Sequence, residues 1–317
     1  MEKASRMRIS PLAPLILCLS SCSLLGIGGG LPDGVEAMSL TGAELRPMKL
    51  EDTTRVKLED NLSAAKAEAE ANPGDEMAAI WYGRRLAYLG RYNEAVAVYT
   101  DALGDHPTSY RLFRHRGHRY ITLRRFEDAV IDLTQASRYA SKIPDKIEPD
   151  GAPNAAGIPR STTRSNIEYH LGLAHYLRGE WGPALEAYQR CLYFSRVNDD
   201  MFVATAYWNV LTMWRLERHD EVADLLEEVR PTMDVIENHD YHELLLLFKG
   251  MRTEEEILER WNAGEGVGNA TLGFGIGAYY LEQGRDAEAQ ALFREIVAGG
   301  VWPAFGAIAA EVEVAGR

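Results

Sequence analysis

The feature that most constrains this chain is a repeat of 34 residues in its first half. Gly83 matches Gly117 and Ala95 matches Ala129, each 34 positions apart. Apolar residues in both copies follow the 3.6-residue period of two short amphipathic helices, and no stretch alternates with a period of two. We therefore expect an all-α solenoid of stacked antiparallel helix pairs, without a β-sheet.

The repeated landmarks are small residues and aromatics, and each has a steric reason. Glycine in the first helix and alanine in the second let the two helices of a unit approach closely, and an aromatic of the second helix is expected to fill the space against the next unit. Two further copies carry the same landmarks, at Gly172, Ala184 and Tyr188 and at Gly277, Ala289 and Phe293. This pattern resembles the tetratricopeptide repeat (TPR), and the resemblance implies a scaffold that holds a partner in a concave groove lined by the first helices.

A narrower resemblance covers most of residues 55–315. The stretches IWYGRRLAYLGRY, EPDGAPN and WPAFGAIAAEVE are similar to a group of bacterial TPR proteins of uncharacterised role. The resemblance implies that the proline-rich insertion and a final helix from Trp302 to about Ala315 belong to the architecture, the helix as a cap on the stack. It implies no activity.

The repeat spacing predicts the domain boundaries. A superhelix is expected over 51–317, with clear repeats at about 76–109, 110–143, 165–198 and 270–303. Degenerate units are expected at about 53–75, 199–236 and 237–269. An insertion at 141–164 interrupts the array, and a loop of that length inside a compact solenoid is usually functional or disordered.

The N-terminus has the composition of a targeting segment. Three basic residues lie among the first eight, an apolar run covers 11–19, and small residues follow, which predicts a signal peptide over 1–21. The run is too short to span a membrane. The sequence LSSC ending at Cys22 resembles the lipobox of bacterial lipoproteins, which implies a lipid on Cys22 and a flexible tether over 22–50. The expected location is a periplasm-facing membrane, outer rather than inner; the alternatives are a secreted or a cytoplasmic protein.

Composition excludes some classes of function. The hydrophobic fraction of 46% is enough for a sizeable core, and the formal net charge of −13 argues against nucleic acid as a partner. Of the three cysteines, only Cys191 lies beyond the targeting segment, so the body can form no internal disulfide.

A basic cluster is the strongest candidate for a binding site. Between Ser109 and Arg125 the chain has six arginines, two histidines and no acid. Four of these side chains share one helical face by their spacing: Arg111, Arg114, His115 and His118. In TPR folds this face lines the groove, so Arg84 and Tyr88 of the preceding unit should join it. Guanidinium groups bind carboxylates in a bidentate manner, which predicts an acidic peptide or protein segment as the partner.

The alternative reading of the cluster is internal pairing. Arg116 occupies a core position and would pair with Asp101 or Asp132, while acids of the insertion (Asp145, Glu148 and Asp150) would fold over the remaining cations. The protein would then be a structural or oligomerising assembly protein, with an oligomeric state that the sequence leaves open.

The sequence contains no recognisable catalytic or cofactor-binding motif. No nucleophile arrangement is recognisable, and the glycine-rich run at 264–277 lacks the spacing of a dinucleotide loop. The histidine pairs at 115/118 and 239/242 lack further ligands. We expect no metal, no cofactor and no enzymatic activity; an enzyme with an unrecognised site in the insertion is the remaining alternative.

Overall fold

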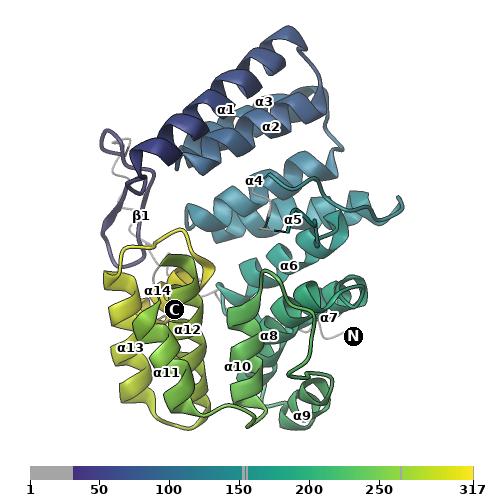
Figure 1. Cartoon of the computed structure of the whole chain (residues 1–317). Helices are drawn as coiled ribbons and strands as arrows, with labels where there is room; N and C mark the ends of the chain where they lie inside the picture. Colours follow the sequence, from purple (N-terminus) through teal and green to yellow (C-terminus); the bar gives the residue numbers. More distant parts are fainter. Residues whose placement is uncertain (1–30, 152–153, 155, 265, 317) are drawn as a thin grey trace, which may run out of the picture. The chain divides into compact units, whose positions relative to one another are not determined.

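The structure is a computed structural model that describes residues 31–151, 154, 156–264 and 266–316. The predicted signal peptide and Cys22 lie outside the described residues. The chain divides into residues 1–32 and residues 33–317, and all the described helices and strands lie in the second unit (Figure 1). Among the described residues, no helix has both the length and the apolar character needed to cross a membrane.

The described residues contain fourteen helices and one two-stranded sheet. In chain order the elements are β1 (Ala37–Met38), β2 (Glu44–Leu45), α1 (Asp52–Ala71), α2 (Glu76–Tyr88), α3 (Tyr92–Asp105), α4 (Tyr110–Thr122), α5 (Phe126–Ala140), α6 (Thr163–Tyr176), α7 (Trp181–Ser195), α8 (Asp199–Arg215), α9 (His219–Glu227), α10 (His239–Phe248), α11 (Glu254–Ala263), α12 (Gly266–Glu282), α13 (Asp286–Ala298) and α14 (Phe305–Ala315).

Helices α2 to α13 pack as six successive pairs, from α2/α3 to α12/α13 (Figure 1). The first helices of neighbouring pairs also contact one another, α2 with α4, α4 with α6, α6 with α8, α8 with α10 and α10 with α12. The surface that these first helices share is called the inner surface below. This arrangement confirms the predicted all-α tetratricopeptide-repeat solenoid.

The glycine landmarks have the steric role that the repeat implies. A Cβ added to Gly172 in α6 would lie 2.6 Å from Cε1 of Tyr188 in α7, and Gly277 faces Phe293 in the same way. The aromatic ring of the second helix therefore occupies the volume that glycine leaves on the first helix of its own pair, and not only the space against the next unit that we expected. Tyr188 and Phe293 are fully buried, which is where large rings contribute most to a core.

Residues 33–50 differ from the flexible tether that we expected over 22–50. Strands β1 and β2 form an antiparallel hairpin, with Val35, Ala37 and Leu45 buried. Trp302 donates its indole N–H to the backbone oxygen of Arg46 at 2.7 Å. The tether prediction is therefore wrong for this segment, and so is the expectation of no sheet. Two-residue strands are too short to produce a visible alternation of apolar and polar residues.

Helix α14 does more than cover the last pair. It packs on α12 and α13, as a cap would, but it also reaches the turn between α4 and α5. There the Arg124 guanidinium and the Glu311 carboxylate form a bidentate ion pair, with Nη2–Oε2 at 2.6 Å and both side chains 3% exposed. Glu311 also accepts the backbone N–H of Leu40 at 2.5 Å. The C-terminal helix is thus bonded to the hairpin and to the second pair.

Candidate functional site

The insertion covers part of the predicted basic cluster. Residues 147–151 run over α2 and α4, with the backbone of Ile147 paired to Thr162 in an isolated bridge. The Glu148 carboxylate lies 3.1 Å from Nη2 of Arg114 and 3.8 Å from Nε2 of His115. Carbonyl oxygens of the same segment accept from Arg84 (Pro149, 2.7 Å) and from Arg85 (Gly151, 3.2 Å). The segment occupies these arginines as an extended acidic peptide would.

The open groove expected at Arg114 and His115 is therefore not what the structure has. Both side chains are buried, at 8% and 7% exposure, under an insertion that is itself held in place. Glu148 accepts from Nδ2 of Asn166 at 3.0 Å and donates its backbone N–H to Ser161 at 3.0 Å. For Arg114 and His115 the structure therefore has the internal pairing that we considered as the alternative.

The other arginines of the cluster and its neighbours have partners of different kinds. Arg111 lies 3.3 Å from the Glu76 carboxylate at the start of α2. The Tyr88 hydroxyl accepts from Arg84 at 3.2 Å. Arg116 forms a bidentate pair with Asp132, at 2.7 and 2.8 Å, and Asp132 is one of the two partners expected for it.

The histidines of this region are neutral. Burial, assisted by the neighbouring arginines, lowers the pKa of His115, His118 and His170 well below the usual range of histidine. The rings of His118 and His170 lie 4.3 Å apart, and both contact Phe305 at the start of α14. Neutral rings can line a binding surface beside arginines without adding to its positive charge.

Arg119 is the side chain that the sequence reasoning missed. It has no hydrogen bond or ion pair to another residue in the part of the chain that the structure describes; its guanidinium lies 5.3 Å from the centroid of the Tyr92 ring. Together with Arg84 and Arg114 it surrounds the Tyr99 hydroxyl and the His115 ring closely enough to act on both electrostatically. From the sequence, we counted Arg119 among the six arginines of the basic cluster without placing it on the groove face.

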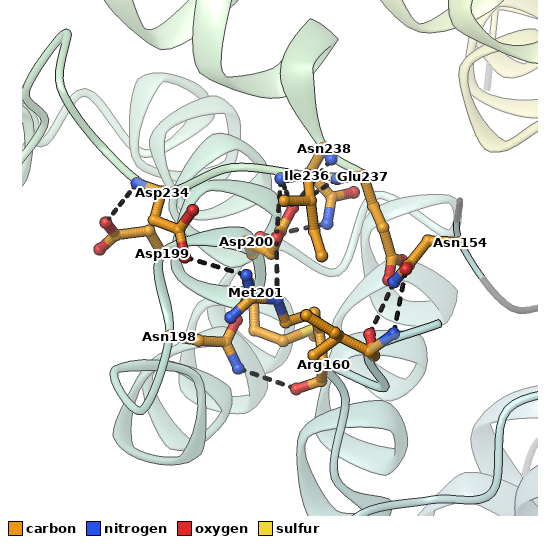
Figure 2. Close-up of polar contacts among 11 residues, drawn as sticks. Asn154, Arg160, Asn198, Asp199, Asp200, Met201, Asp234, Ile236, Glu237 and Asn238 are labelled. Atoms are coloured by element: carbon orange, nitrogen blue, oxygen red, sulfur yellow. Dashed lines mark hydrogen bonds and ion pairs between the residues drawn. The ribbon is translucent and has the colours of Figure 1, made fainter. Parts of the chain in front are cut away.

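A second polar network fixes the loops on the other side of the insertion (Figure 2). The Asp200 carboxylate at the start of α8 is fully buried and lies 3.3 Å from Nε of Arg160 in the insertion. It accepts three successive backbone N–H groups of the loop before α10, those of Ile236, Glu237 and Asn238, at 2.8–3.0 Å. One carboxylate thereby holds both the insertion and the α9–α10 loop.

Metal and nucleophile chemistry has little basis in the described residues. No group of three or more His, Cys, Asp or Glu side chains among them is arranged to hold a metal ion. Cys191 is buried and bonded to Ser165, Ser195 and Thr205, and burial raises the pKa of its thiol to about 11. A thiol in that state is a poor nucleophile.

Comparison with known proteins gives similarity of fold only. No protein-family model and no curated protein sequence matches the chain. Among solved structures, it is similar to a tetratricopeptide repeat protein from Parabacteroides merdae ATCC 43184, at 16% identity and a TM-score of 0.46 over 77% of this chain and 87% of that one. It is also similar to YrrB, a TPR protein with an unusual peptide-binding site, at 14% identity and a TM-score of 0.43 over 75% and 93%. MamA has 16% identity and a TM-score of 0.41 over 55% and 89%. At these scores, nothing about ligands carries over.

Proposed function

We propose that this protein is a protein-interaction scaffold that binds an acidic segment of a partner at Arg84 and Arg119 on its inner surface. The observation that carries the proposal is Arg119, a partly buried guanidinium with no acidic partner among the described residues. Burial lowers the pKa of Arg119 from its usual value, so the charge is held at a cost that a bound carboxylate would offset. Binding rather than catalysis is the proposed role.

The contacts of the insertion support a negatively charged ligand. Glu148 satisfies Arg114, whereas Arg84 donates to the backbone oxygen of Pro149 and to a hydroxyl, and Arg119 lies against a ring. An acidic segment from outside would therefore add to the insertion and bind beside it, without having to displace Glu148. The formal net charge of −13 repels such a segment from most other surfaces, which favours specificity for this one.

A labelled hexaglutamate peptide tests this proposal, with hexaglutamine as the neutral peptide. We expect hexaglutamate alone to bind, and Arg119→Gln to weaken its affinity about tenfold, since a hydrogen bond to a charged group contributes about 1.5–3 kcal/mol. Fluorescence anisotropy at constant ionic strength measures both affinities.

Arg294→Gln in α13 removes the same charge from an exposed position and is the matched control. Equal weakening by the two variants would reduce the effect to net charge and contradict a site at Arg119. Binding of hexaglutamine as tight as that of hexaglutamate would contradict an acidic ligand.

We further propose that the scaffold is anchored at the bacterial cell envelope by a lipid on Cys22, facing the periplasm and in the outer rather than the inner membrane. The support is the sequence of the first 22 residues: basic, apolar, small, then LSSC, with serine rather than aspartate at position 23. A lipid there would hold the inner surface close to membrane partners.

Metabolic labelling with a radioactive fatty acid tests the anchor. In a bacterial host the wild-type chain should incorporate label and sediment with membranes, and Cys22→Ala should lose both properties. Cys191→Ala is the control, because it removes the buried thiol of the body and should leave labelling unchanged. Label retained in Cys22→Ala would contradict the assignment of Cys22 as the lipidated residue.

A further inference from the structure

A cavity of about 520 Å³ lies on the inner surface, and neither Arg84 nor Arg119 lines it. Its walls come from α6, α8, α10 and α12, and Phe305 at the start of α14 and Ser161 of the insertion complete them. The volume falls within the range of roughly 300–1,000 Å³ that is typical of small-ligand pockets. The cavity depends on long-range contacts, because α14 and the insertion reach it from distant parts of the chain.

The polar groups that line this cavity are left mainly as hydrogen-bond acceptors. Asn166 uses its Nδ2 on Glu148 and on Ser161, both at 3.0 Å, so its Oδ1 remains. Asn238 uses its Nδ2 on the backbone oxygen of Asp200 at 3.2 Å, and its Oδ1 likewise remains. His170 is neutral and bonds through Nδ1 to the backbone oxygen of Asn166 at 2.6 Å, which leaves Nε2 with a lone pair.

Asp240, in the first turn of α10, is the half-buried carboxylate of the cavity; Glu237 also lines it, but Glu237 is exposed and accepts from Asn154. The Asp240 carboxylate has no hydrogen bond or ion pair to another residue within the described ranges. The nearest basic groups act on it only at longer range, and Arg260 is paired with Glu243 at 3.6 Å. Burial raises the pKa of Asp240 above its usual value, as expected for a carboxylate without a partner.

Aromatic rings form the other part of the lining. Tyr169 and Tyr241 bond to each other through their hydroxyls at 3.3 Å, and Tyr169 also accepts the indole N–H of Trp208 at 2.8 Å. Phe305 lies 6.3 Å from the Tyr169 ring, measured between centroids. Aromatic faces attract cations, and more strongly where water is excluded.

We propose that this cavity binds a primary ammonium group on an alkyl chain, with the charge on Asp240 and the chain against Tyr169, Tyr241 and Phe305. An ammonium carries three N–H donors and no acceptor, which complements a lining of free acceptors. The same chemistry occurs in a free alkylamine and in a lysine side chain of a partner protein. The ligand is opposite in sign to the acidic segment proposed for Arg84 and Arg119, so the two sites take different ligands.

Two pairs of probes test the proposal in the full chain and separate the sources. The first pair is n-butylamine and n-butanol; the second is a blocked Gly-Lys-Gly peptide and the same peptide with an acetylated lysine. Ligand-observed NMR titration measures each affinity. We expect at least one amine to bind at least tenfold more tightly than its neutral counterpart. Binding of butylamine alone identifies a free amine as the ligand, and binding of the peptide alone identifies a lysine side chain.

The isosteric variant Asp240→Asn should weaken amine binding at least tenfold, because it removes the half-buried carboxylate placed against the ammonium. Gly268→Ala should weaken it too, since the added Cβ would lie 2.5 Å from Oδ2 of Asp240. Asp224→Asn, which removes an exposed acid from α9, is the matched control and should bind as the wild type does.

Two results would overturn the proposal: wild-type protein that binds neither amine better than its neutral counterpart, and Asp240→Asn that binds amine as tightly as Asp224→Asn. The comparison of amine with neutral probe needs no variant, so it remains decisive if Asp240→Asn or Gly268→Ala does not fold. Arg119→Gln removes a positive charge that acts on His170 in the cavity lining, so it should not weaken amine binding, whereas it should weaken binding of the acidic peptide.

Discussion

Replacement of Asp200 by alanine should lower the free energy of unfolding by about 3–5 kcal/mol, the range observed when one partner of a buried ion pair is removed. The carboxylate is fully buried and accepts the backbone N–H groups of Ile236, Glu237 and Asn238. Alanine leaves these three donors without their acceptor and removes one of the two carboxylates paired with Arg160, which keeps Asp234 at 3.0 Å. Each buried donor left unsatisfied costs about 1–3 kcal/mol. Urea denaturation measures the change.

The neighbouring Asp199 provides the matched control. It also accepts a backbone N–H, that of Asp234 at 2.7 Å, but in an exposed part of the loop. Asp199→Ala should therefore cost only about 0.5–1.5 kcal/mol. An equal loss of stability in Asp199→Ala and Asp200→Ala would contradict the role given to the buried carboxylate. Because Glu237 and Asn238 line the inner cavity, Asp200→Ala should also weaken amine binding.

The second large effect is expected at the contact that bonds α14 to the second helix pair. Glu311→Ala should lower the free energy of unfolding by about 3–5 kcal/mol, since it leaves the Arg124 guanidinium buried without a countercharge. It also removes the acceptor of the Leu40 N–H in the hairpin. Thermal and urea unfolding report the loss.

Two further variants distinguish the loss of stability caused by breaking the ion pair from the loss caused by shortening a side chain. The double variant Arg124→Met/Glu311→Leu replaces the pair by apolar groups of similar size and should be much closer to the wild type in stability. Glu295→Ala, an exposed acid of α13, should change stability by less than about 0.5 kcal/mol. A double variant as unstable as Glu311→Ala would show that the pair is not the source of the effect.

The helix pairs were predictable because their determinants are local. The 3.6-residue period and the glycine and alanine landmarks lie within each 34-residue unit, and the partner of Arg116, Asp132, belongs to the same pair. The contacts that join the C-terminal part of the chain to the hairpin and to the second helix pair are not local. Glu311 is 187 residues from Arg124, and Trp302 is 256 residues from Arg46, distances over which no periodic pattern carries information.

One signal of the long-range contact was present in the sequence. The turn after the first helix has glycine at 90, 179 and 284, where φ is +76°, +71° and +71°. The equivalent residue 34 positions after Gly90 is Arg124, which adopts φ +63° and therefore bears a strain of about 1–2 kcal/mol. A side chain in a position that favours glycine indicates a compensating contact, and here the contact is Glu311.

The basic cluster shows the same limit. The sequence predicted the positive charge of the cluster and the helical face that its residues share. It also predicted the two alternatives, an open groove and internal pairing. The position of the insertion determines which arginines of the cluster are paired with an acid. That position is not predictable from the sequence pattern, because Glu148 is held by the side chain of Asn166 and the backbone of Ser161. No motif at Asp240 marked the inner cavity, because its lining comes from five helices and the insertion.

Hydrogen–deuterium exchange of the full chain with and without hexaglutamate tests most directly the central claim, that the inner surface of α2 and α4 is a binding site. Bound peptide should slow exchange in peptides covering Glu76–Tyr88 and Tyr110–Thr122, and in the 146–151 segment beside them. In Arg119→Gln this protection should be lost. Protection confined to the second helices, or unchanged exchange at peptide concentrations that saturate anisotropy, would contradict the claim.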